Sequence, residues 1–174
     1  MENNDPQRPE DVKDSMGKVG WPKEKGRDGE RTPMQWNDSA NAGFSTVAPW
    51  LPVDDRYQSY NVETEKKDPN SILNYYRQLL ALRHTNKALA DGNYIALDES
   101  DPSMLSYARS HDGRNVLVVL NMSGVAQKVS LDLASKGVHA KSAKTLLSSF
   151  TAPTRVDTSQ ILVEPWGAWI GETE

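Results

Sequence analysis

The sequence contains no cysteine, which excludes disulfides, thiolate metal ligands and a cysteine nucleophile. It also lacks any run of about 18 apolar residues, the length that a membrane-spanning helix needs. Residues 1–14 include no apolar stretch, so a signal peptide is not expected there. These absences lead us to expect a cytoplasmic protein with no membrane partner.

A strong excess of charge of one sign is absent as well. The 24 acidic and 20 basic residues are interspersed and give a net charge of −4, so the basic patch of a nucleic-acid-binding protein is missing and no nucleic-acid partner is expected. The three histidines, His84, His111 and His139, are scattered and lack metal-ligand spacing. We expect no metal and no cofactor.

Residues 1–67 are rich in Pro, Gly, Asn and Asp and show neither helical nor alternating apolar periodicity. A segment this polar buries too little apolar surface on its own to offset its ordering entropy. It nevertheless carries several aromatic residues, which disordered linkers avoid. They are Trp21, Trp36, Phe44, Trp50 and Tyr57. We therefore predict a long irregular loop that lies over another body and is anchored by these aromatics.

Residues 68–92 show the pattern of an amphipathic helix. Asp68 is a candidate N-cap, Pro69 would occupy the first helical position, and Asp91 and Gly92 provide a stop. Between them, apolar positions recur at spacings of three and four. The predicted stripe consists of Ile72, Leu73, Tyr76, Leu79, Leu80 and Arg83. Such a stripe needs a partner surface.

Residues 93–174 contain short strand-like segments separated by turn signals, including a hairpin signal at residues 111–114. The segments are 94–97, 104–109, 115–120, 125–133, 145–147, 161–163 and 168–170. This succession predicts an antiparallel sandwich or barrel. Trp166 and Trp169 are three positions apart and need not share a sheet face, and we expect core packing for both rather than an exposed platform for a sugar. The chain as a whole is expected to be mainly β.

The segment GRDGERTPMQWN at residues 26–37 resembles the RD-x-x-RTPMQW motif of glycoside hydrolase family 13, the α-amylase family. It is most similar to the branch of α-glucosidases, oligo-1,6-glucosidases and trehalose synthases. Further segments follow the same pattern at residues 41–45, 49–53, 60–62, 68–77 and 163–168. The resemblance covers essentially the whole chain, and a long motif in register with later ones is not expected by chance.

The resemblance implies a position for the chain within a longer enzyme, because this family combines a (β/α)8 barrel with a C-terminal β-domain. Residues 1–67 would be an irregular substrate-lid loop after the eighth barrel strand, residues 68–92 the last barrel helix, and residues 93–174 a Greek-key-like β-sandwich. The missing barrel portion would be a partner of the chain. Without it, exposed apolar residues favour self-association.

The resemblance also implies a function, the C-terminal part of a bacterial, exo-acting, retaining α-glucosidase that acts on oligosaccharides. Retaining enzymes use one carboxylate as the nucleophile and a second carboxyl group as the acid. In the family's order the catalytic carboxylates precede Met1, so no catalytic residue is assigned here and the chain alone is expected to be inactive. The acids of the loop, Asp28 and Glu30 among them, match no catalytic motif.

One substrate-binding role is implied for an arginine of the motif. In the family this arginine reaches the terminal glucose in subsite −1 and pairs with an aspartate of an earlier barrel loop. A guanidinium fork can bind hydroxyls and a carboxylate at once. Arg31 is the first choice and Arg27 the second. The alternative, favoured for Arg27 but not for Arg31, is that the arginine bridges loop carbonyls or Asp28.

Two other functions stay open from the sequence. The chain could be a stand-alone carbohydrate-binding module, since β-sandwiches with aromatic residues often bind glycans. It could also be a structural β-sandwich that covers one end of a barrel. Binding of maltose or isomaltose by the isolated chain would favour the first of these two.

Overall fold

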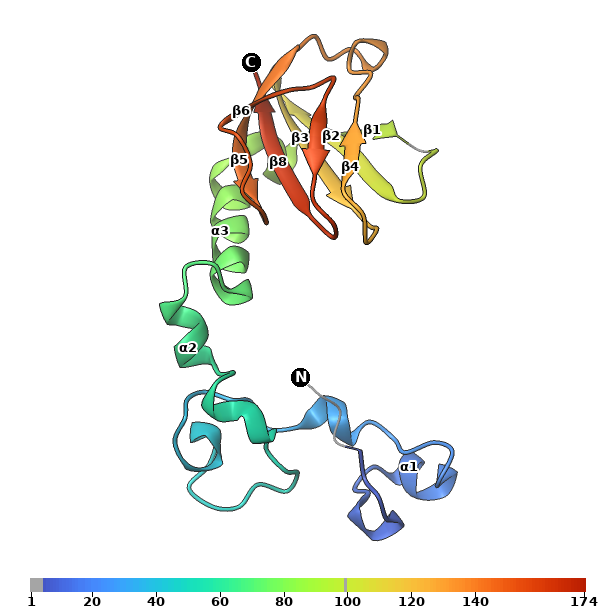
Figure 1. Ribbon diagram of the computed structural model, residues 1–174, viewed down its shortest axis with the longest axis vertical. Coiled ribbons are helices and arrows are strands. Elements are labelled where there is room, and N and C mark those ends of the chain that lie inside the picture. Colours follow the sequence, from blue (N-terminus) through green and yellow to red (C-terminus); the bar gives the residue numbers. More distant parts are fainter. Residues whose placement is uncertain (1–4, 99) are drawn as a thin grey trace. The chain divides into compact units, whose positions relative to one another are not determined.

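The computed structural model describes residues 5–98 and 100–174 (Figure 1). The chain divides into two compact units, Met1–Asn74 and Tyr75–Glu174. The first unit consists of short helices and turns, and the second contains two antiparallel sheets.

The first unit has little regular structure, as its abundance of turn-forming residues predicts. Its buried apolar side chains include Val12, Ala42 and Leu51. Two short α-helices interrupt the irregular loop expected for residues 1–67. They are α1, Ser15–Gly20, and α2, Val62–Lys67; the 3-10 turns are Pro9–Asp11, Asp28–Arg31, Ala40–Gly43 and Asp55–Gln58.

Large apolar side chains of the first unit are exposed rather than packed inside it. Trp36, Phe44 and Trp50 have 49%, 47% and 57% of their surface exposed, and Tyr60 has 64%. Exposed aromatic side chains are candidates for contact with another body where they form a contiguous patch. The expectation that the loop is anchored on another body is consistent with these exposures.

Helix α3 spans Ile72–Thr85 and begins later than the sequence predicts. Ser71, not Asp68, is its N-cap, because the Ser71 hydroxyl accepts a hydrogen bond of 3.1 Å from the main-chain N–H of Asn74. The Asp68 carboxylate instead accepts from the main-chain N–H two residues on, at 2.9 Å, and forms a local turn. The predicted cap at Asp68 is therefore wrong, and Pro69 lies in the turn before the helix.

The predicted single helix is divided at Asn86, which is followed by α4, Lys87–Asp91. Asn86 has φ −100° and ψ 110°, and its side chain accepts a hydrogen bond of 3.2 Å from the main-chain N–H of Leu89. An asparagine cap of this kind starts a new helix. Only α4 ends at the predicted stop, Gly92.

The second unit confirms the predicted antiparallel β-sandwich (Figure 1). A six-stranded sheet has the order β1-β2-β3-β8-β5-β6, and a smaller sheet pairs β4 with β7. The chain passes from the large sheet to the small one and back twice, so that β8 lies between β3 and β5. The bounds are β1 Asn93–Asp98, β2 Met104–His111, β3 Arg114–Asn121, β4 Gln127–Val129, β5 Ser142–Ser148, β6 Arg155–Asp157, β7 Ile161–Val163 and β8 Ala168–Thr173.

Strand β3 is buried on both faces, which explains its continuous apolar sequence. Leu117 and Val119 belong to the core between the two sheets. Val116 and Val118 face the opposite side, where they form a second cluster with α4. A strand with one solvated face would alternate instead.

The predicted apolar stripe of α3 lies on one side of the helix, but most of it is exposed. Leu79 packs against the second cluster, as does Leu82, which lies outside the predicted stripe. Ile72, Tyr76 and Leu80 are instead 74%, 58% and 55% exposed. The helix therefore contacts the large sheet's second cluster through Leu79 and Leu82 and presents other apolar residues to solvent. Self-association through these residues stays a prediction.

The two tryptophans near β8 have different environments. Trp169 is 1% exposed, and its indole N–H donates a hydrogen bond of 3.0 Å to the Thr145 hydroxyl, which confirms the expected core packing. Trp166 is 70% exposed in the turn before β8, with φ 56°. Core packing is therefore wrong for Trp166, because this turn directs it away from the core.

Candidate functional site

Two segments of the first unit approach each other closely, the start of α1 and the chain that leads to the 3-10 turn Asp28–Arg31. A Cβ added to Gly17 would meet the main-chain oxygen of Lys25 at 2.4 Å. A Cβ added to Gly26 would meet the Cβ of Asp14 at 2.7 Å, and Gly26 has φ 76°. Both positions therefore require glycine. The close approach brings Asp14 to the arginines of the motif.

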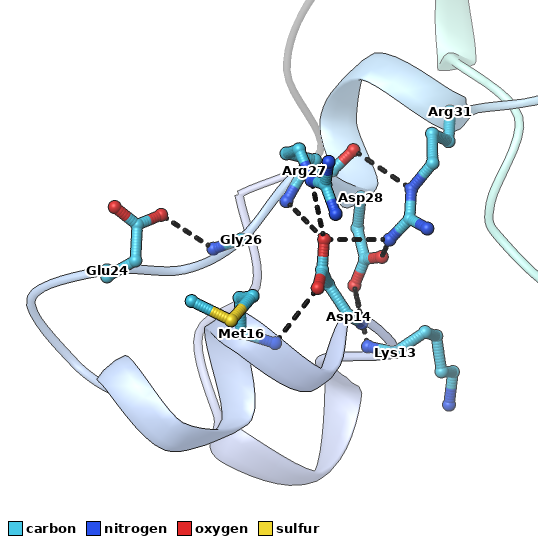
Figure 2. A network of polar contacts seen from close by, with 8 residues as sticks. All are labelled: Lys13, Asp14, Met16, Glu24, Gly26, Arg27, Asp28 and Arg31. Atoms are coloured by element: carbon cyan, nitrogen blue, oxygen red, sulfur yellow. Dashed lines mark hydrogen bonds and ion pairs between the residues drawn. The ribbon is translucent and has the colours of Figure 1, made fainter.

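Asp14, Arg27, Asp28 and Arg31 form what we term the arginine–carboxylate cluster (Figure 2). Arg31 Nη2 donates to Asp14 Oδ2 at 3.0 Å and to Asp28 Oδ1 at 2.8 Å. Arg27 Nε donates to Asp14 Oδ2 at 3.2 Å. Asp14 and Asp28 are only 4% and 1% exposed. Buried carboxylates need such partners, and the two guanidinium groups supply them.

The two carboxylates are also tied to the main chain. Asp28 Oδ2 accepts from the N–H groups of Lys13, at 2.6 Å, and Asp14, at 3.2 Å. Asp14 Oδ1 accepts from Met16 N at 2.9 Å and so caps α1. The main-chain N–H groups of Met16 and Arg27, and then the Arg27 side chain, lower the pKa of Asp14 below its ordinary value. Asp14 is therefore an anion at neutral pH.

The two arginines differ in how many donors remain for a ligand. Arg31 uses Nη2 for both carboxylates, its Nε approaches Arg27 O at 3.4 Å, and its guanidinium lies 5.5 Å from the ring centroid of Trp50. The Arg27 side chain is 66% exposed, against 41% for Arg31. Within residues 5–98 and 100–174, the Nη1 and Nη2 groups of Arg27 have no protein partner. Arg27 thus presents the more open guanidinium.

An ion pair with Asp28 was the alternative to substrate contact, and the sequence favoured it for Arg27. The structure instead shows this ion pair for Arg31. Such a bridge does not exclude contact with a sugar, because Arg31 retains Nη1 as a further donor. Substrate contact by either arginine stays a prediction. The sequence did not single out Asp14, whose partners Arg27 and Arg31 lie 13 and 17 residues away.

The described part of the chain offers no candidate metal site. No group of three or more His, Asp or Glu side chains in residues 5–98 and 100–174 is arranged to hold a metal ion. Over the same residues, every helix is too short or too polar to cross a membrane.

Replacing Gly26 by alanine is expected to open the cluster. The new Cβ would collide with Asp14, in addition to the strain of a positive φ. We expect trypsin to cleave the 174-residue chain after Arg27 at least about tenfold faster, since cleavage follows local opening. Gly113→Ala is the matched control, because Gly113 has φ 79° but no atom within 4 Å of an added Cβ. Equal cleavage at Arg27 in both variants would contradict the expectation.

The two units of the chain match two family models. Residues 1–92 match the family model "Alpha amylase, catalytic domain". Residues 94–170 match "Maltogenic Amylase, C-terminal domain". The chain belongs to the α-amylase family, glycoside hydrolase family 13, and the resemblance in the sequence is confirmed.

Curated relatives extend well beyond this chain. The oligo-1,6-glucosidase of Parageobacillus thermoglucosidasius is 34% identical over 91% of the chain and 27% of its own length. The glucan 1,6-alpha-glucosidase of Streptococcus pneumoniae is 37% identical over 94% of the chain and 28% of its own length. The chain therefore spans little more than a quarter of these relatives.

Solved structures show the same relation. The trehalulose synthase MutB from Pseudomonas mesoacidophila MX-45 matches 99% of this chain with 33% of its own, at 30% identity and a TM-score of 0.79. The isomaltulose synthase of Klebsiella sp. LX3 matches 85% of this chain with 26% of its own, at 29% identity and a TM-score of 0.74. The chain thus corresponds to part of a longer enzyme of the family.

Proposed function

We propose that the chain is the C-terminal part of an exo-acting, retaining α-glucosidase and that it is inactive without the barrel portion. The observation that carries this proposal is the joint match of its two units to the two domains of one family. The missing barrel portion and a terminal α-linked glucose are its partners. The cytoplasmic location expected from the sequence belongs to the same proposal.

The environment of the buried acids supports the absence of catalytic residues. A retaining pair needs a free carboxylate and a protonated carboxyl group about 5–5.5 Å apart, on either side of the scissile bond. Asp14 and Asp28 are instead buried and occupied by guanidinium and main-chain donors. Both are therefore poorly placed to attack an anomeric carbon, and the proposal assigns the reacting carboxyl groups to the remaining barrel.

The arginines then have distinct parts in the proposed subsite. Arg31 is held by two buried carboxylates and by Trp50, and it forms the fixed wall. Arg27 has its outer nitrogens available, and it reaches the hydroxyls of the terminal glucose together with a carboxylate of the barrel. Closure of the pocket by these groups restricts attack to chain ends. Both arginines remain substrate-binding residues, with Arg27 as the more direct contact.

The purified 174-residue chain is expected to release no nitrophenol from p-nitrophenyl α-glucoside, because the reacting carboxyl groups are missing. Turnover should appear when the proposed barrel portion is co-expressed with it. The intact mass of the sample confirms that no longer species is present. Turnover by the chain alone that is abolished in Arg31→Ala would show that the proposal misplaces the catalytic acids.

The exposed Trp166 is the observation that favours the second candidate, a carbohydrate-binding module. An exposed indole can stack on the face of a sugar ring. Titration of the isolated chain with maltose and isomaltose distinguishes the two functions. Saturable binding at millimolar concentration or below, lost in Trp166→Ala, would favour the module over the enzyme part.

A further inference from the structure

We propose that Asp14 is a positioning residue that orients Arg27 and Arg31 for substrate binding, an inference that rests on the proposed role of these arginines. It lies 13 and 17 residues before them in the sequence and contacts both (Figure 2). In the described part of the chain it is the carboxylate that joins the two guanidinium groups.

A single oxygen of Asp14 makes this connection. Its Oδ2 accepts from Arg27 N at 3.1 Å, from Arg27 Nε at 3.2 Å and from Arg31 Nη2 at 3.0 Å. Its Oδ1 accepts from Met16 N at 2.9 Å, which fixes the carboxylate to the first turn of α1. Hydrogen bonds to Asp14 therefore hold both the main chain and the side chain of Arg27 at the first turn of α1.

The use of Nε determines what Arg27 can do. An arginine that donates through Nε keeps Nη1 and Nη2 for another acceptor, while its side chain loses rotational freedom. Asp14 thus removes the disorder of a side chain that is 66% exposed and would otherwise sample many rotamers. Orientation of this kind before the substrate arrives strengthens binding, because less freedom is lost on contact.

Asp28 cannot replace Asp14 in this role. Asp28 contacts Arg31 and the main-chain N–H groups of Lys13 and Asp14, and it makes no hydrogen bond to the Arg27 side chain among the described residues. Loss of Asp14 would leave Arg31 with one carboxylate and Arg27 with none. Arg27 is therefore the group whose orientation depends most on Asp14.

The test uses the complete enzyme of which the chain is proposed to be a part, with p-nitrophenyl α-glucoside as substrate. Asp14→Asn keeps the size of the side chain but offers one neutral acceptor oxygen, which is a weaker partner for guanidinium. We expect kcat/KM to fall about 100-fold, the loss that a misplaced contact group causes. The matched control is Asp11→Asn, an exposed aspartate of the same segment that pairs with Arg8, for which kcat/KM should change by less than about threefold.

A double-mutant cycle separates positioning from a structural role. If Asp14 acts through Arg27, then adding Asp14→Asn to Arg27→Ala should cost little more than Arg27→Ala alone. A structural role would instead give losses that multiply. In the 174-residue chain, the Arg27 Nε–H resonance should be protected from exchange and lose that protection in Asp14→Asn, a readout independent of activity.

The outcomes distinguish the two proposals. Full activity of Asp14→Asn beside an inactive Arg27→Ala would overturn the positioning role and leave the proposed function in place. Multiplying losses in the cycle, or an unprotected Arg27 Nε–H in the unsubstituted chain, would also overturn it. Full activity of both Arg27→Ala and Arg31→Ala would overturn the proposed substrate contacts and the role of Asp14 with them.

Discussion

Arg27→Ala in the complete enzyme of which the chain is proposed to be a part is expected to lower kcat/KM for a terminal α-glucoside by about 100- to 10,000-fold. Two hydrogen bonds from a charged group would be lost, and each contributes about 1.5–3 kcal/mol. The fold should survive, because the Arg27 side chain is 66% exposed and Asp14 keeps its bonds to Arg31 and Met16. Steady-state kinetics together with circular dichroism measure both effects.

Two companion variants make the Arg27 result specific. Arg8→Ala removes an arginine of similar exposure, 65%, that pairs with the nearby surface acids Glu10 and Asp11, and it should leave kcat/KM nearly unchanged. Arg27→Lys keeps the charge but loses the fork and should recover only a minor part of the activity. Activity of Arg27→Ala equal to that of Arg8→Ala would contradict the proposed contact.

Trp169→Ala should have the largest effect on stability, a loss of about 3–5 kcal/mol from the free energy of unfolding of the β-domain. The indole is 1% exposed in the core between the two sheets, and its N–H bonds the Thr145 hydroxyl. Truncation would leave a cavity and would remove one of the two hydrogen bonds of the Thr145 hydroxyl, which still donates to Pro153 O. A domain of this size is stable by only about 5–15 kcal/mol, so a large fraction of that stability would disappear.

The control for Trp169→Ala lies three residues away. Trp166→Ala removes the same side chain from an exposed turn and should change the free energy of unfolding by less than about 0.5 kcal/mol. Urea denaturation of the 174-residue chain can be monitored through the hydrogen exchange or chemical shifts of the β3 amides. These signals report the unfolding of the β-domain alone. If Trp169→Ala lowered the free energy of unfolding as little as Trp166→Ala is expected to, Trp169 would not support the core.

Local patterns in the sequence predicted the β-domain well because its strands carry their own signals. The hairpin between β2 and β3 was readable from Asp112 and Gly113, which adopt φ values of 49° and 79°. Strand β6 was missed, because Arg155–Asp157 has no apolar pattern and is defined by its pairing with β5. The exposure of Trp166 was missed for a similar reason, since a turn decides it rather than the spacing of residues.

The helix break and the site also depend on contacts that local sequence patterns do not reveal. The break at Asn86 depends on a cap to Leu89, and asparagine inside a periodic segment gives only a weak signal of it. Arg27 and Arg31 were found through a motif of neighbouring residues. Asp14 was not found, because its contacts join two segments that meet only when Gly17 and Gly26 allow their close approach.

The place of β8 in the large sheet has a consequence for biosynthesis. Among the strands of the described residues, β8 comes last in the sequence, yet it pairs with β3 on one side and β5 on the other. While the ribosome is still adding β8, the sheet is split into two halves whose inner edges are unpaired, and such edges promote aggregation. We therefore expect the domain to be most prone to aggregation before β8 is in place.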